Sequence, residues 1–173
     1  MNIYPPLRTT HSTQLSPGEL VRAPFGADFL LAIAVRDPLP AGDARSGLLY
    51  LESNNQFPVP SYMETERENP LVLSFGVGFE IIVPNDPAKI DLNGNRYWRS
   101  PGAILIRDDL IFLIAHSPNP ANPLLRVFLD LKTWELVDAP QPLDIIMLGE
   151  WKLRFSGYPE DHELSKPLVR FSL

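Results

Sequence analysis

Cysteine is absent from this chain of 173 residues. Its absence excludes disulfide bonds, cysteine-based zinc sites and a cysteine nucleophile. It is also typical of a protein kept in a reducing compartment, and we therefore expect a cytoplasmic location.

Long apolar runs are missing as well. The longest, Phe29 to Val35 and Leu110 to Ala115, are much shorter than the roughly 20 residues that a membrane-spanning helix requires. The stretch Met1 to Pro6 lacks the basic and apolar regions of a secretory signal. We therefore expect no membrane partner and no export.

Basic residues are few, with 15 Lys and Arg against 21 Asp and Glu and a net charge of −6. Affinity for nucleic acids depends largely on basic side chains that neutralise phosphates, so this balance argues against a nucleic-acid partner. The basic and aromatic stretch "RYWR" at 96–99 could stack on bases. We interpret it instead as one strand with alternating core and surface positions.

The common catalytic and metal-binding signatures are also missing. The sequence has no G-x-S-x-G elbow, no phosphate-binding G-x-x-x-x-G-K-[ST] loop and no G-x-G-x-x-G. "HELSK" at 162–166 has Lys166 in place of a second zinc ligand, and "DLNGN" at 91–95 continues with Arg96 in place of the turn glycine of a calcium loop. We expect no metal and no cofactor, and the missing motifs favour a non-catalytic protein.

Proline, by contrast, is abundant, with 19 residues. Because proline is excluded from helix interiors and from central strands, these residues indicate loops between many short elements. One short helix is expected near 61–69, where Ser61 and Glu64 form a capping box and Asn69-Pro70 ends it. Otherwise we expect a single all-β domain over residues 1–173.

Four segments carry the strand signal. Apolar residues alternate along 71–83 and along 145–155, which predicts two long half-buried strands. Segments 29–35 and 110–115 are apolar at every position, which is typical of strands covered on both faces. Asn93-Gly94 predicts a tight hairpin, because both turn positions favour a positive φ.

A short motif occurs twice, as "SPG" at Ser16 and again at Ser100. After each copy the same order follows: an apolar strand, a Pro-x-Pro loop, a strand in which Tyr50 matches Phe128, and an alternating strand. This order suggests duplicated halves, approximately 14–84 and 98–158, followed by a C-terminal strand at 167–173. Coincidence of strand and turn patterns is the alternative.

Together these signals predict an antiparallel β-sandwich or a closed β-barrel of about eight to ten strands. Such barrels often bind small molecules at their mouths. Arg36, Asp108, Asp109 and His116 stand at the ends of the matched strands and are the candidate ligand-binding residues. The alternative is that these polar residues only mark strand ends near solvent.

Our leading hypothesis is a non-catalytic protein that acts by association, with itself or with another protein as an accessory subunit. The candidate interface is Phe75, Gly76, Val77, Gly78 and Phe79, because two glycines would let a partner backbone approach closely. The other hypothesis is a small-molecule-binding barrel, with or without hydrolase or isomerase activity.

Overall fold

The computed structural model describes residues 7–38, 44–54, 58–84, 90–91, 100–117, 125–140 and 145–173. Within these ranges the protein is all-β, as predicted. Its strands are β1 (Arg8–His11), β2 (Leu20–Phe25), β3 (Asp28–Pro38), β4 (Ala44–Tyr50), β5 (Ser61–Glu64), β6 (Leu71–Gly76), β7 (Phe79–Ile82), β8 (Ile90–Asp91), β9 (Ile104–Arg107), β10 (Leu110–His116), β11 (Arg126–Asp130), β12 (Glu135–Val137), β13 (Ile146–Leu148), β14 (Glu150–Phe155) and β15 (Val169–Ser172).

Helical structure is confined, in the described residues, to two single turns of 3-10 helix: η1 (Ser12–Gln14) and η3 (Glu163–Ser165). Neither turn has the length and apolar character needed to cross a bilayer.

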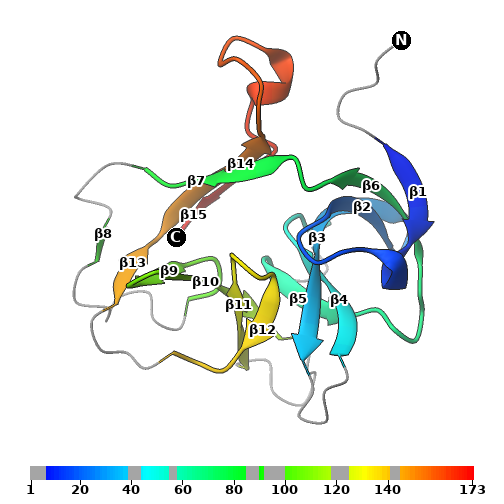
Figure 1. Ribbon diagram of the computed structural model, residues 1–173, viewed down its shortest axis with the longest axis horizontal. Helices are drawn as coiled ribbons and strands as arrows, with labels where there is room; N and C mark the ends of the chain where they lie inside the picture. Colours follow the sequence, from blue (N-terminus) through cyan, green and yellow to red (C-terminus); the bar gives the residue numbers. More distant parts are fainter. Residues whose placement is uncertain are drawn as a thin grey trace.

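Six strands, β3, β4, β5, β10, β11 and β12, close into a barrel (Figure 1). β3–β4–β5 and β10–β11–β12 are each an antiparallel meander. The meanders join edge to edge through two parallel contacts, His116 with Ser61 and Glu135 with Arg36. The predicted antiparallel pairing therefore holds within each meander but not at these two junctions.

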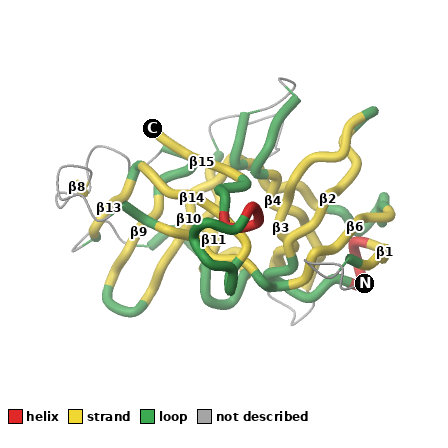
Figure 2. Tube along the Cα trace, turned by 90° about the horizontal axis from the view of Figure 1, so that it is seen from above, coloured by secondary structure: helices red, strands yellow, loops and turns green. Residues whose placement is uncertain are grey.

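The pairings outside the barrel follow one pattern in both halves of the chain. β2 extends the sheet from β3, β6 pairs with β2, and β1 pairs with β6. In the same order β9 pairs with β10, β13 with β9, and β8 with β13. Figure 2 shows β1–β4 and β6 gathered on one side of the molecule and β9–β11 and β13 on the other.

The two "SPG" turns are built alike. Gly18 and Gly102 have φ values of 86° and 91°, which an L side chain rarely adopts. The amide of Glu19 donates to Ser16 O (3.2 Å), and that of Ala103 donates to Ser100 O (3.1 Å). Each glycine lies under an aromatic ring, so a side chain in place of either would also collide with its neighbour.

The predicted long strands 71–83 and 145–155 are not continuous. Each divides into two, β6 and β7 in the first case and β13 and β14 in the second. β7, β14 and β15 form a separate three-stranded sheet. In the first case Gly76, with φ 76°, provides the turn that takes the chain from one sheet to the other.

The predicted helix at 61–69 is wrong. Ser61–Glu64 is β5, which pairs with β4 from Tyr50 to Gly47. The Ser61 hydroxyl donates to the carbonyl of Pro58, so it does not form the expected capping box. Pairing with a distant strand has overridden a local capping signal, as tertiary contacts often do.

Apolar side chains form three clusters. The central one fills the barrel and continues into Trp151, Leu153 and Phe155 of β14, so the three-stranded sheet covers one end of the barrel (Figure 1). The other two clusters lie on the outer faces of β3 and β10, and the paired strands β2 and β9 respectively contribute side chains to them. The end of the barrel away from the three-stranded sheet is the one that bears the site described next.

Candidate functional site

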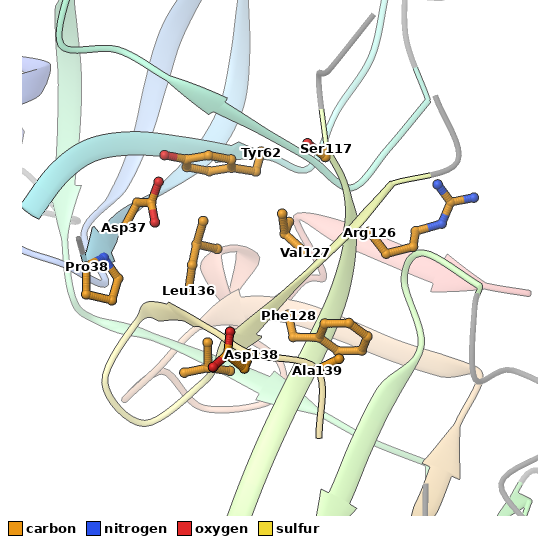
Figure 3. A pocket seen from close by; sticks show the side chains of 11 residues that line it. Asp37, Pro38, Tyr62, Ser117, Arg126, Val127, Phe128, Leu136, Asp138 and Ala139 are labelled. Atoms are coloured by element: carbon orange, nitrogen blue, oxygen red, sulfur yellow. The ribbon is translucent and has the colours of Figure 1, made fainter. Parts of the chain in front are cut away.

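A pocket of about 840 Å³ lies at this end of the barrel, beside the ends of β3 and β10 and the start of β11 (Figure 3). We call it the mouth pocket. By the two-residue period of strands, each barrel strand turns one side chain inward at this level. These six positions form the mouth layer: Asp37, Gly47, Tyr62, Ser117, Val127 and Leu136. All except Gly47 line the mouth pocket.

Tyr62 is the most unusual residue of the mouth layer. Its side chain is buried, with 6% of its surface exposed, and its hydroxyl oxygen has no hydrogen-bond partner in the structure described. The ring lies over Gly47, where a Cβ atom would come within 2.1 Å of Cε2. Glycine on β4 therefore makes room for the ring, whose hydroxyl points toward Asp37 (Figure 3).

The surroundings of Tyr62 hold its hydroxyl in the neutral form. Burial is the main cause that raises the pKa of Tyr62 well above its usual value, and the negative charges of Asp37, Glu64 and Glu66 add to it. Arg45 acts in the opposite direction. A neutral phenol both donates and accepts hydrogen bonds, so Tyr62 offers both functions to the pocket.

Asp37 brings an unpaired carboxylate to the same place. The nearby cations are already engaged, because Arg45 Nη1 contacts Glu64 Oε2 at 3.1 Å and Arg36 Nη1 contacts Glu135 Oε1 at 3.6 Å. Within the described ranges, no basic side chain lies within ion-pair distance of Asp37. The pocket therefore combines a free carboxylate with a free hydroxyl.

Two of the predicted ligand-binding residues lie next to the mouth pocket but not in it. Arg36 is exposed and pairs with Glu135, and His116 is half-buried beside Arg126. Burial first, and then the charge of Arg126, lowers the pKa of His116 from its ordinary 6.5 and so favours the neutral ring at pH 7. The residue that follows each of them, Asp37 after Arg36 and Ser117 after His116, lines the pocket instead.

The other two predicted residues are not brought to the pocket. Asp108 and Asp109 form the exposed turn between β9 and β10, where Asp108 has φ 51°. His116 is at the other end of β10, roughly 20 Å away for a strand of this length. The structure therefore separates these carboxylates from the mouth pocket by the length of the barrel strand.

The candidate interface lies at the bend between β6 and β7. Phe75 packs on Phe155 with ring centroids 5.7 Å apart, and Phe79 packs on Trp134 at 5.5 Å. The bend itself is the most open part: Val77 is 65% exposed, and no atom lies within 4 Å of a Cβ placed on either neighbouring glycine.

Within the described residues, the remaining sequence motifs add no site. No group of three or more metal-ligating side chains occurs among the residues whose structure is described. His162, from "HELSK", caps η3 by accepting from the Leu164 amide at 3.1 Å. The Asn93-Gly94 hairpin and "RYWR" lie outside the described residues.

Sequence reasoning missed Asp37 and Tyr62, the two polar residues on which the proposed site depends. The capping-box pattern predicts a helix at Tyr62, whereas the structure pairs this residue with Leu49 of β4. Asp37 continues the inward series Ile33 and Val35 along β3 and could have been found from that alternation.

The chain matches no protein-family model, no curated protein and no solved structure.

Proposed function

We propose that this protein binds a small molecule in the mouth pocket. The supporting observation is the buried Tyr62 hydroxyl without a hydrogen-bond partner. Leaving such a group unpaired costs about 1–3 kcal/mol, and buried polar groups are nearly always bonded. A ligand in the pocket would supply the missing partner.

The size and lining of the pocket also support this proposal. Its volume of about 840 Å³ falls within the roughly 300–1,000 Å³ of known ligand sites. Val127 and Leu136 provide apolar surface, while Asp37 and Tyr62 provide polar groups at one side (Figure 3). An apolar wall with few convergent polar groups is typical of small-molecule sites.

Native mass spectrometry of untagged protein, released gently from its own cells, tests the proposal. We expect a discrete adduct of small-molecule mass on the wild-type chain and a several-fold loss of that adduct in Tyr62→Phe. Tyr158→Phe is the matched control, since Tyr158 stacks on His162 and does not line the pocket. Bare wild-type protein would contradict the proposal.

Association is the second candidate function, and the exposure of Val77 favours it. Covering an exposed apolar side chain is favourable because it removes apolar surface from water, and the flanking glycines leave space for a partner backbone. The same spectra would show masses at multiples of 19.5 kDa or an added protein subunit. We expect Val77→Asp to abolish such species without lowering the melting temperature; an unchanged assembly would place the interface elsewhere.

We also infer that the two halves of the chain arose by duplication. The repeated pairings and the two "SPG" turns support this origin. Ala34 faces Leu48 in the first half and Ile114 faces Phe128 in the second, so the strand register favours Leu48, not Tyr50, as the counterpart of Phe128. A cytoplasmic location stays a prediction from composition.

A further inference from the structure

The mouth pocket has an excess of negative charge. Two carboxylates, Asp37 and Asp138, line it, and neither has an ion pair with a basic side chain in the described part of the chain. The basic residue of the lining is Arg126, whose guanidinium points away from Tyr62 and from both carboxylates (Figure 3). Beside Tyr62 the pocket therefore supplies acceptors and the negative charge of Asp37, and Asp138 adds a second negative charge farther from Tyr62 (Figure 3).

The neighbouring cations do not cancel this charge. Arg45 is the register neighbour of Asp37, but its guanidinium binds Glu64. Arg36 binds Glu135 on the outer face of the barrel. With both arginines engaged, an anionic ligand group beside Asp37 would find no free cation, whereas a cationic group would find an unpaired carboxylate.

We infer that the ligand carries an alkylammonium or alkylguanidinium group that donates to the Asp37 carboxylate and to the Tyr62 hydroxyl oxygen. This inference rests on the small-molecule site proposed above and names its ligand class. Ammonium and guanidinium groups have only donors, which match a carboxylate and a phenol oxygen. The alkyl chain would lie against Val127 and Leu136, which provide the apolar wall.

Charge assistance makes the contact with Asp37 the stronger of the two, because hydrogen bonds between ionised groups are roughly twice as strong as neutral ones. The Tyr62 hydroxyl adds direction, since it is held by its ring against Gly47. The same chemistry has two sources: a free amine or guanidine, and a lysine or arginine side chain of another protein.

Calorimetric titration of the full chain distinguishes these possibilities. The probes are agmatine and cadaverine as free cations, Ac-Gly-Arg-Gly-NH2 and Ac-Gly-Lys-Gly-NH2 as blocked side chains, and 1-pentanol and glutarate as neutral and anionic controls. We expect at least one cation to bind, and neither control. Tighter binding of the peptides would assign the site to a protein side chain, and tighter binding of the free cations to a small molecule.

Variants locate the contact. Asp37→Asn should weaken cation binding by about tenfold or more, and Tyr62→Phe by about threefold to tenfold. Asp109→Asn removes the same charge at the far end of β10 and should leave the affinity unchanged. Because a variant could fail to fold, wild-type binding is also measured at low and high NaCl, where charge pairing predicts weaker binding in salt.

Several outcomes would overturn the inference. Binding of glutarate or pentanol in preference to the cations would do so, as would equal agmatine affinity in wild type and Asp37→Asn. If no cation binds while native spectra carry an adduct, the ligand class is wrong and the small-molecule site stands. If no probe binds and no adduct is present, both proposals fail.

Discussion

Two buried tyrosines differ in how their hydroxyl groups are satisfied. The Tyr50 hydroxyl donates to the carbonyl of Pro24 at 3.1 Å, whereas the Tyr62 hydroxyl has no partner within the part of the chain described. We predict that Tyr50→Phe lowers the free energy of unfolding by about 1 kcal/mol, and that Tyr62→Phe leaves it unchanged or raises it slightly. Urea denaturation of the ligand-free proteins measures both. An equal loss in the two variants would mean that Tyr62 is bonded in the fold.

A buried carboxylate makes stability depend on pH. Burial alone would raise the pKa of Glu19, but hydrogen bonds from Arg8, Ser74 and the Ser16 amide, together with the charge of Arg8, lower it below the ordinary 4.5. The unfolded state then binds the proton more readily than the native state, so the stabilisation is present above pH 4.5 and is lost as pH falls through the lower native pKa.

We therefore predict that Glu19→Gln costs about 1–3 kcal/mol at pH 7, because it removes charge from a buried network that includes Ser74. It should also flatten the fall of melting temperature with acid below pH 4.5. Glu160→Gln, at an exposed position, is the control and should keep the wild-type profile. A Glu19→Gln profile as steep as that of wild type would contradict the assignment.

At the scale of elements, the second "SPG" turn is held by aromatic packing. The Trp151 indole N–H donates to Gly102 O at 2.7 Å, and Trp151 stacks on Phe171 with centroids 5.5 Å apart. A Cβ on Gly102 would lie 1.7 Å from Phe171 Cζ, and φ there is positive. The turn and β15 therefore constrain each other.

Alanine substitutions separate the cost of a positive φ from the cost of a collision with Phe171. Gly157 has φ 79° and no atom within 4 Å of a Cβ, so Gly157→Ala should cost only the about 1–2 kcal/mol of a left-handed backbone. Gly102→Ala should cost about 1–3 kcal/mol more, from overpacking against Phe171. Thermal unfolding compares the two variants. Equal losses would show that Phe171 moves aside freely.

At the scale of the whole molecule, neither half can close the barrel alone. The meander β3–β4–β5 forms one half of the barrel, and β10–β11–β12 forms the other. Each isolated meander would therefore expose the two strand edges that form the parallel junctions in the full chain. We predict that the full chain unfolds in one transition, with coincident circular dichroism and tryptophan fluorescence curves. Fragments 1–84 and 85–173 should show no cooperative transition separately. A cooperative transition in either fragment would contradict this dependence.

The all-β fold, the "SPG" turns and the central strands could be predicted from local sequence. Proline density excludes long helices, Pro-Gly at 17–18 and 101–102 suits a turn with positive φ, and runs apolar at every position suit strands covered on both faces. These preferences belong to the residue or its immediate neighbours. These local preferences therefore favour the same backbone conformation whatever the position of the rest of the chain.

Tertiary structure alone decided the parallel junctions, the strand at Ser61–Glu64 and the site. Ser61 could cap a helix, but its segment pairs with β4 instead. Pairing with a distant strand cannot be read from a local sequence pattern. Which side chains meet at the barrel mouth depends on strand pairing: Asp37 and Tyr62 come together when β3, β4 and β5 pair, and the side chains of the second meander join them when the barrel closes. Local sequence determined most of the extended segments; non-local pairing determined the strand at Ser61–Glu64, the partners of the strands and the residues that face the pocket.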